Sequence, residues 1–285
     1  MRNETEMMDL VINFGNGNND IRVITMEGSR LNVHAPKDQF QDYDITYILS
    51  NMNKYIADKS WLDVFGKRFM MQEPEGMSLF QAHLGNWYSF LMIYEDGNKM
   101  DLKLVPLNEL DEYFKRTDSL KKILLDKDGI CPEIAEPSDA DYLVKKPSRE
   151  FVEDSANEFW LLSAYVTKGI CRNEKIYAIK HLDLMQNQLL QMISWKVGIE
   201  TNFSLSVGKS YKYLDKYVTK ETWDSIIRTY KKDSIEAMWE SLLLCCKLFT
   251  EACDFVSHAL NYDTTAYGEK MMEYIKGYLP KNIKP

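Results

Sequence analysis

The sequence predicts an α+β protein in which a β-rich N-terminal half forms a mixed sheet flanked by helices and a C-terminal half forms a helical bundle. In the first half, short runs of β-branched and aromatic residues alternate with turn residues. In the second half, apolar residues recur every three or four positions. The chain has 285 residues, which is enough for two domains. We predict them at 1–130 and 151–285, with a linker at 131–150.

Five strands are expected in the first half: residues 22–26, 43–49, 68–71, 88–94 and 100–105. The segment Asp96-Gly97-Asn98 separates the last two strands and predicts a hairpin turn. A helix is expected before the first strand, with Met7, Leu10 and Val11 on its apolar side.

Residues 126–148 are rich in proline, glycine and acids and show no period, which marks a boundary. Behind it, Ser155-Ala156-Asn157-Glu158 has the pattern of a capping box, so a helix is expected to begin there. The apolar stripe of a second helix is predicted at Ala178, Leu182, Met185, Leu189 and Met192. A third helix, capped at residues 233–236, has its predicted stripe at Met238, Leu242, Cys245, Phe249, Ala252, Val256 and Leu260.

The composition is that of a soluble globular protein, with 45% hydrophobic and 27% charged residues. No apolar run is long enough to cross a bilayer, and the first residues lack a signal-peptide pattern. The net charge of −8 argues against nucleic acid as a partner and favours the approach of small polycations. We therefore expect a cytoplasmic protein that binds neither membrane nor nucleic acid, and we expect it to be a monomer.

The cysteines and histidines do not predict a metal site. There are five cysteines, an odd number without a Cys-x-x-Cys pair, which indicates reduced side chains. Two of them, Cys245 and Cys246, lie in an apolar helical stretch, where a thiol acts as a small hydrophobic group. The four histidines also lack metal-ligand spacing: His34, His83, His181 and His258.

Asp42 and Asp44 open the second predicted strand and are the first candidate catalytic residues. Residues i and i+2 of a strand point to one face, so the two carboxylates repel each other unless a cation lies between them. Mg²⁺ suits such a position because it takes oxygen ligands and bridges to substrate phosphates. The alternative is a solvated turn that leads into a strand. Tyr43, Ile45 and Tyr47 are expected to face the core.

Asp101 is a third candidate because it interrupts an otherwise core-like strand, where an unpaired acid is costly. Three carboxylates can together hold one or two Mg²⁺ ions in phosphoryl transfer. Gly28 and Ser29 directly follow the first strand. Glycine permits a close backbone approach, and the serine hydroxyl and nearby N–H groups can bind phosphate at a helix N-terminus. Arg30 adds a guanidinium group for phosphate oxygens.

This order of a strand, Gly28-Ser29, Asp42-x-Asp44 and a distal Asp101 resembles the nucleotidyltransferase superfamily typified by DNA polymerase beta. Several segments are similar to the aminoglycoside 6-adenylyltransferases, the streptomycin-modifying enzymes: residues 28–30, 40–44, 192–201 and 205–209. The likeness runs from residues 7–9 to the C-terminal helices. It implies that 1–130 is a catalytic nucleotidyltransferase domain and that 151–285 is a helical substrate-binding domain.

The resemblance implies transfer of AMP from ATP to a hydroxyl of an aminoglycoside, with streptomycin favoured, release of pyrophosphate, and antibiotic resistance. It implies Mg²⁺ as cofactor, held by Asp42, Asp44 and Asp101, and ATP as co-substrate. Asp101 is either the general base or a third metal ligand, and related antibiotic adenylyltransferases favour the base. Ser29 and Arg30 would hold the β- and γ-phosphates.

In the helical half, Lys209 is the candidate phosphate contact and Lys212 the second choice, with a solvated cation as the alternative for both. Trp160 and Trp195 would stack on a sugar or on adenine, or else lie in the core.

At least one acid beyond residue 150 is expected to contact a cationic acceptor, with Glu158 and Glu200 as candidates or as ordinary surface acids. Three other functions stay open from the sequence. They are the same transfer to another small acceptor such as a lincosamide, adenylylation of a protein, and non-catalytic nucleotide binding.

Overall fold

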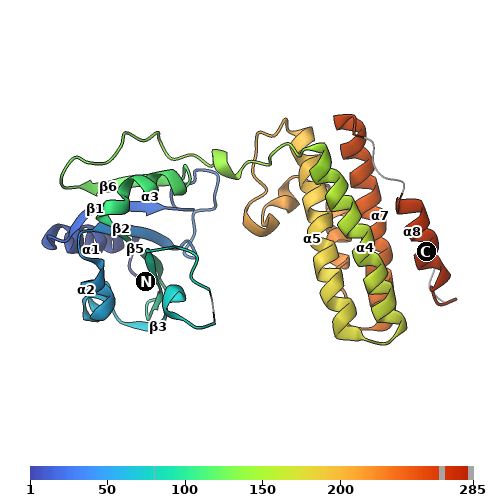
Figure 1. The fold of residues 1–285 in the computed structure, drawn as a ribbon, viewed down its shortest axis with the longest axis horizontal. Helices are drawn as coiled ribbons and strands as arrows, with labels where there is room; N and C mark the ends of the chain where they lie inside the picture. The colour runs from blue at the N-terminus through green and yellow to red at the C-terminus, as the bar shows by residue number, and fades with distance from the viewer. Residues whose placement is uncertain (80, 263–266, 282–285) are drawn as a thin grey trace. The chain divides into compact units, whose positions relative to one another are not determined.

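In the computed structural model, which describes residues 1–79, 81–262 and 267–281, the chain divides into two units, Met1–Asp141 and Tyr142–Pro285 (Figure 1). The division falls inside the segment 131–150 that was expected to be a linker. The expected helical domain, 151–285, includes residues 263–266 and 282–285, which lie outside the described part. A mixed sheet forms the core of the first unit and helices form the second, so the predicted α+β class is confirmed.

The first unit is built on a six-stranded sheet with the strand order β3-β4-β5-β2-β1-β6. β2 and β5 run parallel, and every other pair of neighbouring strands is antiparallel. The strands are β1 Ile21–Glu27, β2 Tyr43–Leu49, β3 Arg68–Gln72, β4 Tyr88–Tyr94, β5 Lys99–Pro106 and β6 Lys121–Asp126. All five predicted strands are present, and Asp96-Gly97-Asn98 forms the hairpin turn between β4 and β5.

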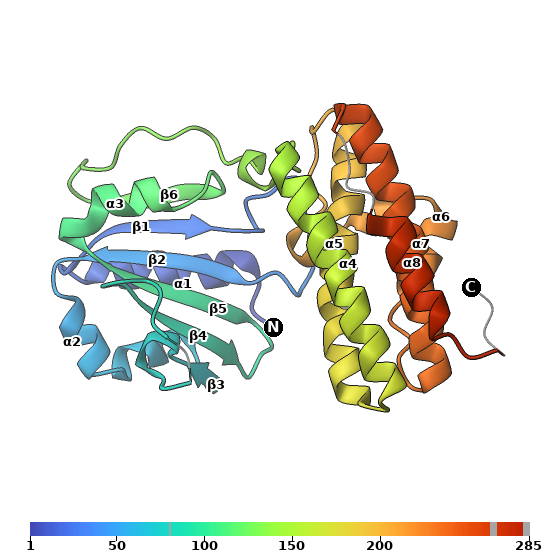
Figure 2. The same ribbon diagram turned by 45° about the vertical axis from the view of Figure 1, so that its right-hand side comes forward.

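Three helices flank the sheet: α1 Glu4–Gly17, α2 Met52–Ala57 and α3 Leu110–Arg116 (Figures 1 and 2). α1 is the predicted first helix, and it buries Met7 and Val11 completely on one face of the sheet. α3 lies over the opposite face, where Tyr113 packs in a second cluster with Val23 and Ile48. Burial of apolar side chains on both faces fixes the strands that carry the candidate acids.

Strand β6 was not expected from the sequence. Its three consecutive apolar residues, 123–125, lie between charged ends and show no alternation. The strand exists because its backbone pairs antiparallel with β1, from Val23 opposite Asp126 to Glu27 opposite Lys121. Such long-range pairing leaves no local pattern in the sequence.

The second unit is a helical bundle in which α4 (Arg149–Cys171), α5 (Lys175–Glu200) and α7 (Ile235–Leu260) run side by side (Figure 2). α6 (Lys220–Arg228) contacts α7, and α8 (Tyr267–Gly277) contacts α4. The predicted stripes on α5 and α7 are buried, apart from the partly buried Leu260. The predicted cap of α7 is confirmed, because the Ser234 side chain accepts a hydrogen bond from the Ala237 backbone N–H. None of the described helices is both long and apolar enough to span a membrane.

The predicted start of α4 was wrong. The helix begins at Arg149, and Ser148 is its N-cap, with a side chain that accepts a hydrogen bond from the Phe151 backbone N–H. Ser155 lies in the second turn, buried, and donates its hydroxyl hydrogen to Gln188. The true cap was overlooked because it follows the proline-rich boundary, whereas the later Ser-x-x-Glu pattern precedes a more apolar run.

Candidate active site

Carboxylates gather on one face of the sheet where β1, β2 and β5 meet. Asp44 lies opposite Asp101 in the parallel β2–β5 ladder and opposite Glu27 in the antiparallel β1–β2 ladder. Asp42 precedes Asp44 by two positions and shares its face. The intervening Tyr43 is buried on the α1 face, as are Ile45 and Tyr47. The fold therefore brings the three predicted acids together and adds Glu27 to them.

Lys99 bridges two of these acids. Its ammonium group lies 2.5 Å from Asp42 Oδ2 and 2.9 Å from the Asp101 carboxylate, and it donates a hydrogen bond to each. The Asp101 Oδ1 atom is equally near the ammonium but is buried and accepts no hydrogen bond within the described part of the chain. A buried carboxylate oxygen without such a partner is costly. Lys99 thus acts as an internal counter-ion that compensates the acids only in part.

Asp44 shows the electrostatic cost of this arrangement. Burial, together with the charges of Asp101, Asp42 and Glu27, raises the pKa of Asp44 to about 6, although Lys99 opposes the shift. Both burial and like charge disfavour the ionised carboxylate. A further cation beside Asp44 would remove this penalty.

The donor chemistry of the cluster fits a hard divalent cation, because such ions take carboxylate oxygens as ligands. Within the described residues, no three acidic, histidine or cysteine side chains already surround a common metal position. The reason is visible in the geometry, since the Lys99 ammonium lies between Asp42 and Asp101. An ion held by Asp42 and Asp101 together would therefore have to displace the Lys99 ammonium from at least one of them.

The backbone of Gly28 lies directly against the Asp44 side chain. Its φ angle is +80°, and a Cβ atom at this position would lie 2.2 Å from Asp44 Oδ2. The Gly28 backbone N–H donates to the Leu120 carbonyl at 3.0 Å, which anchors the turn to the residue just before β6. The glycine predicted for a close backbone approach therefore makes that approach to the central carboxylate itself.

We expect Gly28→Ala to lower the free energy of unfolding by about 1–3 kcal/mol, because it combines a left-handed backbone with a steric clash. Turnover should fall by at least the factor to which this free energy corresponds, because the clash displaces Asp44. Thermal unfolding and steady-state kinetics measure the two effects. Gly129→Ala is the matched control, since Gly129 has φ +63° but no atom within 4 Å of its Cβ position. Equal behaviour of both variants would show that the contact with Asp44 is immaterial.

Ser29 follows in a run of turns. No helix starts here, contrary to the expected helix N-terminus, and residues 28–42 lie in turns, bends and irregular structure. Leu31 and Asn32 donate backbone hydrogen bonds to the carbonyls of Gly28 and Ser29, which closes the chain into consecutive turns. Any phosphate held at this point would meet the Ser29 hydroxyl and turn N–H groups rather than a helix terminus.

Arg30, the predicted phosphate contact, has partners within the chain. Its Nε and Nη2 atoms donate to the carbonyls of Asp42 and Gln41 at 3.0 and 2.8 Å. Nη1 pairs with Glu4 at 3.1 Å, and the guanidinium lies 3.6 Å from the Tyr43 ring centroid. All three nitrogens are engaged and the side chain is only 9% exposed. Arg30 therefore positions the backbone that carries Asp42.

Glu27 is a charged residue of this region that the sequence did not single out. It accepts hydrogen bonds from Lys103, Tyr113 and Thr46. Burial alone would raise the pKa of Glu27, but Lys103 and the two hydroxyl groups hold it below its ordinary value. Lys99, Asp101 and Lys103 are every second residue of β5 and therefore share one face of the sheet. This spacing in the sequence is the signal that could have placed both lysines beside the acids.

The remaining candidates belong to the second unit or to loops. Lys209 and Lys212 are exposed, at and just after a single helical turn at residues 209–211. Trp160 and Trp195 are buried in the bundle core, and Glu158 and Glu200 are exposed. Two histidines have local partners, His34 with Asp139 and His181 with the Tyr177 carbonyl, whereas the other two are exposed: His83 and His258.

A strand followed by a Gly-Ser turn, with carboxylates on two adjacent parallel strands, is the arrangement expected of a nucleotidyltransferase. A family model described as streptomycin adenylyltransferase matches residues 1–278, and the chain belongs to this family.

Three relatives are called aminoglycoside 6-adenylyltransferase. The Bacillus subtilis (strain 168) protein is 41% identical over 97% of this chain and 98% of its own length. The Campylobacter jejuni protein is 44% identical over 96% and 95%, and the Staphylococcus aureus protein is 37% identical over 97% and 98%. A crystal structure of an aminoglycoside 6-adenyltransferase from Bacillus subtilis covers 98% of this chain and 99% of its own, with 38% identity and a TM-score of 0.48.

Proposed function

We propose that this protein transfers AMP from ATP to a hydroxyl group of an aminoglycoside, with streptomycin the favoured acceptor, and releases pyrophosphate. The observation that carries the proposal is the pairing of Asp44 with Asp101 across β2 and β5, with Asp42 beside them and Gly28 against Asp44. The three relatives named for this activity support the choice of acceptor over a lincosamide, a protein or mere nucleotide binding.

Mg²⁺ is the proposed cofactor, and Asp42, Asp44 and Asp101 are the residues that would hold it. When bound, the ion neutralises charge on the phosphates as pyrophosphate leaves. The Ser29 hydroxyl would bind the outer phosphates, together with the backbone N–H groups of this turn other than those of Gly28, Leu31 and Asn32, which donate to carbonyls of the chain. Arg30 would act through the Asp42 backbone that it holds.

Asp101 is the proposed general base. Its buried Oδ1 atom accepts no hydrogen bond within the described residues, but it lies 2.9 Å from the Lys99 ammonium, so its lone pairs would take the proton of an attacking hydroxyl only once that ammonium has moved away. Lys99 would then release the carboxylate as the substrates bind, because a carboxylate paired with an ammonium is a poorer base. Lys209, in the helical unit, remains a proposed phosphate contact. We also propose that the protein is cytoplasmic and monomeric.

An acceptor panel tests this function. The purified protein is incubated with ATP, Mg²⁺ and single acceptors, including streptomycin, other aminoglycosides and a lincosamide. We expect pyrophosphate release to depend on an aminoglycoside, and the product to gain the mass of one adenylyl group. ATP consumption without an adenylylated aminoglycoside, or with modification of the lincosamide alone, would contradict the proposal.

Salt should weaken the encounter with a cationic acceptor. The chain has a net charge of −8 and attracts polycations over long range. Raising the ionic strength from about 0.05 to 0.5 M shortens the Debye length about threefold, so the KM for streptomycin should rise. The KM for ATP should change less, because Mg²⁺ offsets much of its charge. A KM that is insensitive to salt for every cationic acceptor would refute the steering argument.

A further inference from the structure

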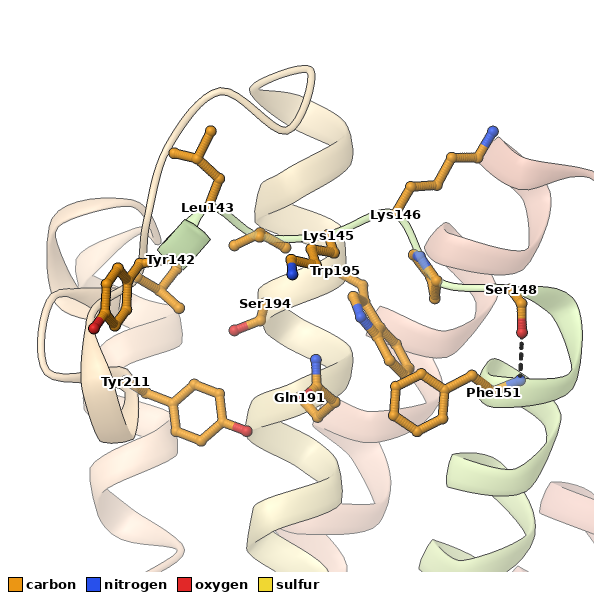
Figure 3. A pocket seen from close by; sticks show the side chains of 13 residues that line it. Tyr142, Leu143, Lys145, Lys146, Ser148, Phe151, Gln191, Ser194, Trp195 and Tyr211 are labelled. Atoms are coloured by element: carbon orange, nitrogen blue, oxygen red, sulfur yellow. Dashed lines mark hydrogen bonds between the residues drawn. The ribbon is translucent and has the colours of Figure 1, made fainter. Parts of the chain in front are cut away.

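A cavity of about 330 Å³ lies within the second unit, between the segment 142–148, helix α5 and the turn at Tyr211 (Figure 3). Pockets for small ligands generally range from about 300 to 1,000 Å³, so the cavity can admit a compact ligand. Its apolar wall includes Val144 and the edge-to-face pair of Phe151 and Trp195, whose ring centroids are 5.3 Å apart. The catalytic carboxylates described above do not contribute to it.

Ser194 is the unusual residue of this cavity. It is 2% exposed, and its Oγ atom makes no hydrogen bond within the described part of the chain. A serine inside a helix normally donates to a carbonyl one turn earlier, and a buried hydroxyl without a partner is costly. Ser194 is among the residues that line the pocket, and Figure 3 shows its hydroxyl turned away from Trp195, on the side of Tyr142 and Tyr211. A ligand inside the cavity would supply the missing partner.

The other polar groups that line the cavity are mainly donors. The side chains of Lys145, Gln191 and Tyr211 have no hydrogen-bond or ion-pair partner among the described residues. Figure 3 shows the Lys145 ammonium on the Ser194 side, whereas the ammonium of the neighbouring Lys146 points away. No aspartate or glutamate occurs among the described lining residues. The charged side chains among these lining residues are therefore cationic, whereas the whole chain has a net charge of −8.

Two backbone features reinforce this character. The segment 142–148 leads into the N-terminus of α4, a helix of 23 residues whose dipole favours an anion at this end. Tyr211 is held at φ +62°, in the left-handed region that a bulky residue seldom adopts. That conformation places the phenol at the cavity, and such backbone strain is concentrated at ligand sites.

We propose that this cavity binds a phosphoryl group, held by the Lys145 ammonium and the Ser194 hydroxyl. A guanidinium or amino group is a poor match, because the cavity offers Lys145 and no carboxylate. The phosphoryl group is carried either by the nucleotide, in which case the inference rests on the proposed function, or by a free small phosphate compound. The acceptor antibiotic would then have to meet its carboxylate partners elsewhere.

Pyrophosphate binding to the full-length protein tests the inference. Calorimetric titration in EDTA excludes divalent ions, so the acid cluster of the first unit repels the anion and binding reports on the cavity. We expect saturable binding that Lys145→Ala and Ser194→Ala each weaken about tenfold, since each removes a charge-assisted hydrogen bond. Lys146→Ala is the matched control and should bind within about twofold of the parent protein. Absence of saturable binding, or equal affinity of all four proteins, overturns the inference.

Thermal unfolding separates a binding role from a structural one. Ser194→Ala removes a hydroxyl without a partner, so the free protein should not lose stability, while its stabilisation by pyrophosphate should shrink. A loss of stability in the free variant with unchanged stabilisation by pyrophosphate would assign Ser194 to the core instead.

ATP in EDTA identifies the source of the phosphoryl group. Competition with pyrophosphate points to the nucleotide, and absence of competition points to a free phosphate compound. AMP transfer with Mg²⁺ is assayed separately. Adenylylation of streptomycin without pyrophosphate binding in EDTA would support the proposed function and overturn this inference. Pyrophosphate binding without adenylylation would support this inference and overturn the proposed function.

Discussion

Replacing Asp44 by asparagine is expected to abolish AMP transfer while the fold stays intact. Asp44 lies between Asp101, Asp42 and Glu27, so it is the central carboxylate of the cluster and the first proposed ligand of the metal ion. Loss of a metal-ion contribution of several kcal/mol lowers turnover by about 10³-fold or more. The substitution keeps the side-chain shape and removes one of the mutually repelling charges. Stability without divalent ions should therefore be maintained or rise.

Steady-state turnover and thermal unfolding in EDTA together test this expectation. Asp42→Asn should lose activity in the same way, although it also removes one partner of Lys99. Asp63→Asn is the control, because Asp63 is an exposed acid that pairs with Arg68 outside the cluster. Near-normal turnover of Asp44→Asn with an unchanged Mg²⁺ requirement would remove Asp44 from the reaction.

Asp101→Asn is expected to lower kcat by about 10²–10⁴-fold, the usual contribution of a general base. Asparagine keeps an oxygen in the same place but cannot take up the proton of the attacking hydroxyl. The affinity for Mg²⁺ with a non-hydrolysable ATP analogue should stay nearly native. Equilibrium binding and single-turnover kinetics on one preparation separate these two quantities.

The same experiment decides the alternative role. If Asp101 is chiefly a metal ligand, metal affinity falls together with the rate, and the assignment as base is wrong. If neither changes, Asp101 is a structural acid whose charge serves only to pair with Lys99.

Most of the sheet and the bundle follow from local periodicity. The alternation around Asp44 and the three-and-four spacing of α5 and α7 reflect side chains that must be buried on one face. Features that depend on pairing between distant segments leave no such local pattern. β6 is ordered by its pairing with β1, and the start of α4 lies in a polar segment next to prolines.

The candidate site also combines features that local spacing predicts with features that only the fold shows. Asp42 and Asp44 share a face by strand geometry alone, so the sequence was sufficient to pair them. Their proximity to Asp101 depends on the parallel β2–β5 register, which no local spacing encodes. For Arg30, a guanidinium after Gly-Ser predicted a phosphate contact, and only the fold shows Glu4 and the 41–42 carbonyls around it.

We propose that the carboxylates of β2 and β5, with Asp42 beside them, form a divalent-cation site. Electron paramagnetic resonance titration with Mn²⁺, in the presence of a non-hydrolysable ATP analogue, tests it most directly. We expect a saturable site in the parent protein and in Asp63→Asn, and its loss in Asp44→Asn. Equal Mn²⁺ binding by all three proteins would contradict it.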